Sequence, residues 1–135
     1  SGWYELAFNE RLDATIAATA ANDGMRLALA ISYGGRQEIV DAVKKLAVKV
    51  QRGELSPDAI DERALHAALY HPELPDPDLL IRTAGERRIS NFLLWQVSYA
   101  EIHVGEVCWP DFRAEHLHAA FRDYGARVRK FGKVP

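Results

Sequence analysis

PDPDLLIRTAGERRISNFLLWQVSYAE, residues 75–101, is the stretch from which we predict the fold. Leu79–Ile81 form a short apolar run after Pro and Asp, which is typical of a buried parallel strand. A polar turn follows, and Ser90 is a good N-cap for a helix over 90–99. That helix is apolar nearly all round, which predicts a buried helix in the core or at a subunit interface.

Positive charge gathers where the predicted strand ends. Arg82 follows the strand directly, and Arg87 and Arg88 lie in the turn before Ser90. Ligands of open α/β sheets bind beyond the carboxyl ends of the strands, and a helix N-terminus attracts anions. Guanidinium groups match phosphate oxygens, so we predict a phosphate or diphosphate site. The alternative is that these arginines pair with the acidic residues beside them, Asp78 and Glu86, on a solvated loop.

Composition limits the classes of protein to be considered. The chain has 135 residues, 48% hydrophobic and 27% charged, as expected for one soluble globular domain. A net charge of −2 gives no reason to expect nucleic-acid binding. The single cysteine, Cys108, excludes an internal disulfide and fits a reducing compartment. No apolar run approaches the roughly 18 residues that span a bilayer, and no signal-peptide pattern is present.

The rest of the chain alternates between strand and helix patterns. We predict helices over 4–22, 36–52, from Ser56-Pro57 onward, and over 113–129 with Asp111 as cap, and further strands over 26–32 and 102–107. This order predicts an α/β fold, a parallel sheet of about three strands flanked by helices. A sheet this small has exposed edges, so we expect another copy or a further segment to cover them.

Glycines mark the turn Tyr33-Gly34-Gly35-Arg36, before the helix over 36–52. The turn is either a phosphate cradle or a tight connection that needs glycine dihedrals, and the structural role is the favoured one.

Several motifs together resemble one family. DLLIRTAGERRISNFLLWQVSYAE at 78–101, YGGRQEI at 33–39, VCWPDF at 107–112 and RVRKFG at 127–132 occur in the order seen in cis-prenyltransferases, the undecaprenyl diphosphate synthase family. The chain is similar to the C-terminal part of these enzymes from about Phe8 to Gly132. It departs from the family pattern at Ser32, where Asn is usual, and at Lys130, where Arg is usual, so the role of the Lys130-Phe131-Gly132 tail stays open.

The resemblance implies an activity, partners and site residues. Cis-prenyltransferases join isopentenyl diphosphate to an allylic diphosphate such as farnesyl diphosphate, with Mg²⁺, for lipid-carrier synthesis. By resemblance, Arg82, Arg88 and Ser90 bind isopentenyl diphosphate, with the backbone of Ile89 between them, and Glu101 is the metal-associated glutamate. Considered without the family, Glu101 is more often a solvated or salt-bridged side chain. The family also implies a homodimer in the cytoplasm, with peripheral membrane contact through the lipid product.

The resemblance also implies a limit on activity. Relatives carry their catalytic aspartate in a His-x-x-Met-Asp-Gly-Asn-Gly-Arg-type motif, which these residues do not contain. We therefore expect residues 1–135 to be the C-terminal portion of one cis-prenyltransferase-like domain, with no catalytic residue of its own and no prenyl transfer alone. Two alternatives stay open: a non-catalytic partner subunit or scaffold, and a generic phosphate-binding α/β module. The second lacks a Gly-x-Gly-x-x-Gly or Walker pattern.

Overall fold

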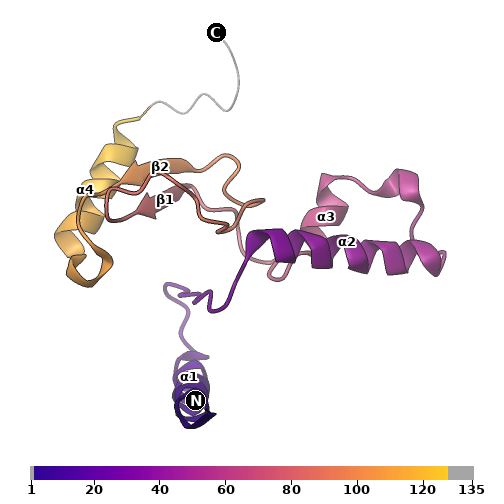
Figure 1. Ribbon diagram of the computed structural model, residues 1–135, viewed down its shortest axis with the longest axis horizontal. Helices are drawn as coiled ribbons and strands as arrows, with labels where there is room; N and C mark the ends of the chain where they lie inside the picture. Colours follow the sequence, from indigo (N-terminus) through magenta and orange to yellow (C-terminus); the bar gives the residue numbers. More distant parts are fainter. Residues whose placement is uncertain (1, 128–135) are drawn as a thin grey trace. The chain divides into compact units, whose positions relative to one another are not determined.

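The computed structural model describes the backbone of residues 2–127, and their side chains from Asn9 onward. The chain falls into two compact units that divide after Ile31 (Figure 1). The tail motif at 128–132 and the last residues of the predicted helix 113–129 lie outside the described residues. Within the described part, no helix is both long enough and apolar enough to cross a membrane.

The first unit contains one helix and an irregular segment. Helix α1 spans Gly2–Thr19, so the predicted helix over 4–22 is confirmed and ends slightly earlier. The predicted strand over 26–32 is wrong for the described residues, because this segment forms no regular structure. A strand exists only when a neighbour takes up its backbone hydrogen bonds, and no described residue forms a ladder with this one.

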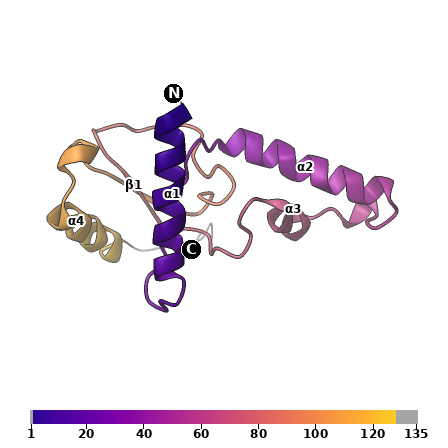
Figure 2. The ribbon, with the colours of Figure 1, turned by 90° about the horizontal axis from the view of Figure 1, so that it is seen from below.

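The second unit begins with a helical hairpin. Helix α2 spans Gly35–Gln51, as predicted, and packs beside α3, Glu62–Ala68 (Figures 1 and 2). A small apolar core joins them, made of Ala42, Leu46, Ala68 and Leu69, with Trp95 packed against it.

The helix predicted to start at Ser56-Pro57 is broken. Pro57–Ala59 form a single 3-10 turn, and Ile60 is extended with a ψ of 103°. Helix α3 starts only after Asp61, whose carboxylate accepts a hydrogen bond from the Ala64 N–H at 2.8 Å. This hydrogen bond makes Asp61 the N-cap of α3. The helix therefore has its N-cap five residues after Ser56, the predicted one.

The sheet holds two parallel strands. Strand β1, Leu79–Arg82, pairs with β2, Glu101–Val104, in the register Leu79 to Glu101. Helix α4, Ala114–Gly125, packs against β2 (Figure 1). The α/β class and the parallel pairing are confirmed, but the described residues supply two strands and not three, because the segment 26–32 does not join.

The predicted cap of the last helix is also wrong. Asp111 ends a 3-10 turn, Trp109–Asp111, and Phe112 is extended, so Asp111 lies too early to cap α4. Arg113 is the N-cap residue, and its N–H donates to His116 Nδ1 at 2.9 Å. The histidine ring thus takes up a backbone donor at the start of the helix.

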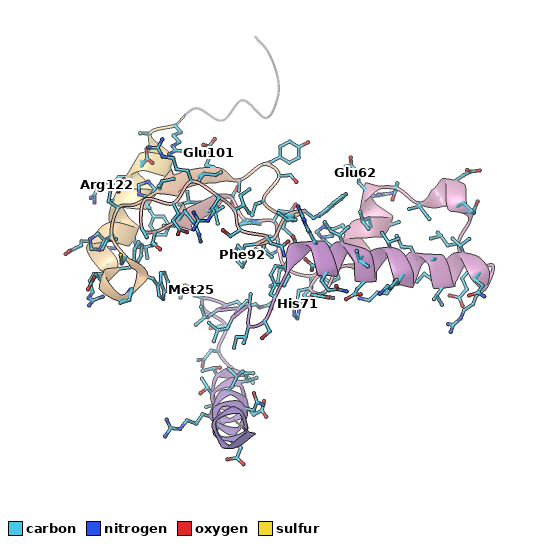
Figure 3. The ribbon with its side chains drawn as sticks, in the orientation of Figure 1. Met25, Glu62, His71, Phe92, Glu101 and Arg122 are labelled. Atoms are coloured by element: carbon cyan, nitrogen blue, oxygen red, sulfur yellow. The ribbon has the colours of Figure 1, made fainter. Side chains whose placement is uncertain are left out.

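The predicted buried helix over 90–99 does not form. Ser90, Asn91 and Leu93 have φ values of 54°, 65° and 46°, in the left-handed region that no α-helix contains. The segment is a chain of turns in which Val97 alone is buried. Phe92 lies at the N-terminal end of α2 (Figure 3). Its ring packs edge-on against that of Tyr33, with the ring centroids 5.9 Å apart.

Candidate anion-binding site

The turn after β1 is fastened to the chain that follows β2. The N–H of Ala84 donates to the Val107 carbonyl at 2.9 Å, and that of Gly85 to the Gly105 carbonyl at 3.0 Å. Gly85 has a φ of 63°, and a Cβ there would lie 2.7 Å from a carboxylate oxygen of Glu106. Glycine is therefore favoured at this position. These hydrogen bonds hold the turn, and the residues that follow it, at the carboxyl end of the two-stranded sheet.

Two of the predicted arginines meet on one carboxylate. Arg82 and Arg88 each donate from Nη2 to a different oxygen of Glu86. Arg82 Nη2 also lies 3.4 Å from the Ser90 hydroxyl oxygen. The structure therefore brings together Arg82, Arg88 and Ser90, and it places Glu86 between the two arginines as the alternative interpretation expected.

A hollow of about 490 Å³ lies over this cluster. Its lining includes four arginines, Arg82, Arg87, Arg88 and Arg127, against two carboxylates, Glu86 and Asp123, and it includes Ile89. Arg82 Nε is buried and has no hydrogen-bond partner among the described residues. Positive charge thus exceeds negative charge around the hollow, as an anion site requires.

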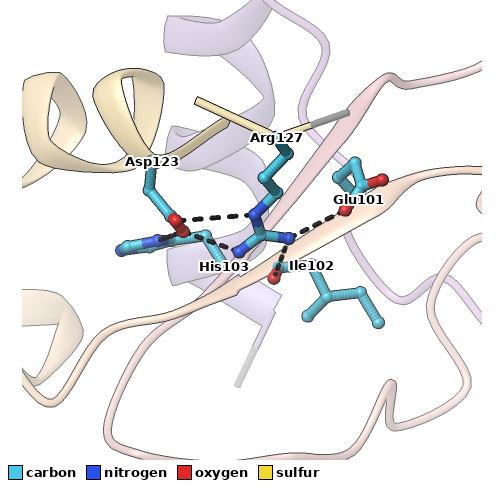
Figure 4. Close-up of polar contacts among 5 residues, drawn as sticks. All are labelled: Glu101, Ile102, His103, Asp123 and Arg127. Carbon is cyan, nitrogen blue, oxygen red and sulfur yellow. Dashed lines mark hydrogen bonds and ion pairs between the residues drawn. The ribbon is translucent and has the colours of Figure 1, made fainter. Parts of the chain in front are cut away.

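Glu101 lies in a second charge cluster beside the hollow. Arg127 donates from Nη1 to Glu101 Oε2 at 2.8 Å and to the Ile102 carbonyl at 3.0 Å, and from Nη2 to Asp123 at 2.6 Å (Figure 4). Asp123 also contacts His103 Nδ1 at 2.7 Å. Glu101 is therefore salt-bridged. Sequence inspection missed this cluster, although the spacing of Asp123 and Arg127 on a helix was a usable signal.

Comparison with known proteins decides the family. The family model Prenyltransf, described as an undecaprenyl diphosphate synthase, matches residues 5–132. The chain belongs to the cis-prenyltransferases. It is 48% identical over 126 residues to an isoprenyl transferase of Geobacter sulfurreducens, a match that covers 93% of this chain and 51% of that relative.

Two further relatives agree. A ditrans,polycis-undecaprenyl-diphosphate synthase of Escherichia coli K12, specific for (2E,6E)-farnesyl diphosphate, is 49% identical over 93% of this chain and 51% of its own length. The crystal structure of lavandulyl diphosphate synthase from Lavandula x intermedia, in complex with dimethylallyl diphosphate, matches with a TM-score of 0.84 and 41% identity. That match covers 93% of this chain and 54% of the lavender protein. The chain thus spans about half the length of these relatives, and the predicted resemblance is confirmed.

The glycine turn of this cis-prenyltransferase chain has a structural role. Asn91 takes up the first N–H groups of α2: Gly35 N–H donates to its carbonyl at 2.8 Å, and Arg36 N–H to its Oδ1 at 2.9 Å. These donors are therefore not open to a phosphate. Gly34 has an ordinary φ of −146°, so the predicted need for glycine dihedrals is wrong. Glycine is needed for close approach, because a Cβ on Gly34 would lie 3.0 Å from the Asn91 amide.

The second charge cluster predicts an acid-sensitive contact between α4 and β2. Hydrogen bonds from Arg127 and His103 lower the pKa of Asp123 below its ordinary value of 3.8. A lowered folded-state pKa stabilises the fold above the unfolded pKa, and this contribution is lost as pH falls through the folded value. We expect the chain to melt at a higher temperature than an Asp123→Asn variant at pH 7 and at the same temperature near pH 2. The exposed Asp58→Asn variant is the control. A gap that persists at pH 2 would contradict the prediction.

Proposed function

We propose that the protein acts as a cis-prenyltransferase that joins isopentenyl diphosphate to an allylic diphosphate such as farnesyl diphosphate, for lipid-carrier synthesis. In this proposal the chain supplies the isopentenyl diphosphate half of the site. One observation carries it: at the carboxyl end of β1, Arg82 and Arg88 share the Glu86 carboxylate and line the hollow, and Arg82 also reaches the Ser90 hydroxyl. Family membership and the names of the relatives support the same reaction class.

The chemistry of the cluster suits a diphosphate head group. Guanidinium groups bind phosphate oxygens through two parallel N–H donors, and a serine hydroxyl can donate to a third oxygen. Glu86 occupies both arginines in the structure, so the diphosphate has to displace its carboxylate or share the arginines with it. A diphosphate carries more charge than one carboxylate, which favours the exchange. Ile89 would meet the phosphates through its backbone.

Mg²⁺ does not fit the described residues alone. The ion prefers octahedral oxygen ligands, usually carboxylates together with substrate phosphates. No group of three His, Cys, Asp or Glu side chains able to hold a metal gathers among residues 9–127. Glu101 already pairs with Arg127, so we propose it as one ligand at most, which would need carboxylates from outside this set.

The assembly and location of the protein are also proposals. Strand β1 has one edge without a ladder partner among the described residues, and a further segment or a second copy of the chain would cover it. We propose a homodimer in the cytoplasm that meets the membrane through its lipid product.

Binding and turnover test the proposal separately. We expect isothermal titration calorimetry to show isopentenyl diphosphate binding to the chain, and inorganic monophosphate to bind more weakly because it offers fewer oxygens. We expect labelled isopentenyl diphosphate to enter no polyprenyl product when the chain is incubated alone with farnesyl diphosphate. Failure to bind would refute the half-site. Robust incorporation would refute the expected absence of a catalytic residue.

A further inference from the structure

Glu38 is the one charged side chain that is buried among the described residues, with 2% of it exposed. It lies in the first turn of α2, and no salt bridge of the described residues includes it. Its carboxylate accepts three hydrogen bonds from neutral donors. These are the Tyr33 hydroxyl and Gln96 Nε2, both on Oε2, and the Tyr70 N–H on Oε1. The donor distances are 3.1 Å for Gln96 and 3.0 Å for Tyr70.

A buried carboxylate without a counter-ion is costly unless donors surround it. Burial raises the pKa of Glu38, and the hydrogen bonds from Tyr33, Tyr70 and Gln96 lower it by more, so the net shift is downward from 4.5. The side chain is therefore ionised at neutral pH. Hydrogen bonds to an ionised acceptor are about twice as strong as neutral ones. Glu38 thus joins three separate segments firmly: the turn before α2, the chain after α3, and the turn segment 90–97.

The third of these segments carries Ser90 of the anion site. Asn91 fastens its beginning to the N-terminus of α2, through the two hydrogen bonds from Gly35 and Arg36. Gln96 fastens its end to Glu38, one turn further along the same helix. Ser90, Asn91 and Leu93 have left-handed backbone conformations, which residues other than glycine rarely adopt. The segment therefore needs these contacts with α2 to hold its shape.

We propose that Glu38 is a positioning residue for the diphosphate site: through Gln96 it holds the segment that places Ser90 beside Arg82. This inference rests on the proposed function. Glu38 does not line the hollow. Gln37, its neighbour on α2, makes the same kind of contact, from Nε2 to the Asp41 carboxylate at 2.9 Å, but this contact stays within the helix. Loss of the Gln96 contact should therefore disturb the anion site, and loss of the Gln37 contact should not.

A matched pair of variants tests the proposal. Gln96→Leu and Gln37→Leu each remove one amide donor from a carboxylate of α2 and keep the side-chain volume nearly constant. Glu38 itself is left in place, because its replacement would leave three donors without an acceptor. Thermal unfolding measures the stability of each variant. Isothermal titration calorimetry measures the Kd for isopentenyl diphosphate on the full chain.

We expect Gln96→Leu to raise the Kd about tenfold, the equivalent of one charge-assisted hydrogen bond, and Gln37→Leu to leave it within twofold. In a Ser90→Ala background, Gln96→Leu should add little, because both changes act through the same hydroxyl. Equal effects of Gln96→Leu and Gln37→Leu on the Kd would overturn the proposal. So would full additivity with Ser90→Ala.

Failure of the proposed function gives a different result. If the unaltered chain does not bind isopentenyl diphosphate, or if Arg82→Ala binds it as well as the unaltered chain does, the half-site itself is refuted. If Arg82→Ala loses binding while Gln96→Leu keeps it, the half-site stands and the positioning role of Glu38 is refuted.

Discussion

Replacement of Arg82 by alanine should weaken binding of isopentenyl diphosphate roughly 10- to 100-fold. Arg82 is the last residue of β1, is about one-third exposed, and contacts both Glu86 and Ser90. Its loss removes charge-assisted hydrogen bonds to the phosphates, each of which contributes about 1.5–3 kcal/mol to binding. It also leaves Glu86 paired with Arg88 alone, so the net charge of the three-residue cluster falls from +1 to 0. Isothermal titration calorimetry gives the Kd.

Two further variants show whether the loss is specific to the site. Arg82→Lys keeps the charge but lacks the planar pair of donors, so its Kd should lie between those of the unaltered chain and Arg82→Ala. Arg63→Ala removes an arginine whose side chain is 95% exposed and distant from the hollow lining, and it should bind normally. If Arg82→Ala is folded, by circular dichroism, and binds within twofold of the unaltered chain, the proposed site is wrong.

The second large effect is expected at Gly35. A Cβ at this position would lie 2.9 Å from Leu94 Cγ, 3.0 Å from the Leu94 nitrogen and 3.2 Å from the Asn91 carbonyl oxygen. Two of these atoms are backbone, so the turn segment has to move away from α2. Gly35→Ala should therefore lower the free energy of unfolding by about 1–3 kcal/mol, the usual cost of overpacking. It should also weaken binding of isopentenyl diphosphate, because the segment carries Ser90.

Gly125→Ala is the matched control for that substitution. Gly125 ends α4, and a Cβ there would meet nothing within 4 Å. Alanine in a helix is favoured over glycine by up to about 1 kcal/mol, so this variant should be as stable as the unaltered chain or slightly more stable. Chemical denaturation measures both variants. The close-approach argument fails if Gly35→Ala is as stable as Gly125→Ala.

Local patterns in the sequence predicted part of this fold correctly. The helix over 36–52 repeats apolar residues at helical spacing, and the apolar run before Arg82 is too short for a helix. Both elements formed as expected: sequence neighbours decide the helix, and β2 supplies the ladder that the strand needs. The arginines and Ser90 were also found locally, since all lie within nine residues of the end of β1.

The segment 90–99 shows why local patterns were not enough elsewhere. Ser90 followed by apolar residues has the pattern of a capped helix, yet the chain forms turns there. Asn91 instead accepts the N–H of Arg36, 55 residues earlier in the first turn of α2, and no local pattern reveals that contact. The same holds for Glu38, whose partner Gln96 is 58 residues away. The family motifs, by contrast, needed no knowledge of these contacts.

The order of residues alone was enough for the α/β class, the family and the choice of the arginines that we propose to bind the anion, because these depend on short segments and their spacing. The tertiary structure decided which hydrogen-bond donors and acceptors already have partners within the chain. Asn91 occupies the N-terminus of α2, Arg127 occupies Glu101, and Glu86 lies between Arg82 and Arg88. Hydrogen bonds and ion pairs form between whichever groups folding brings within about 3 Å, and the partners of Asn91 and Glu101 here come from segments far apart in the chain.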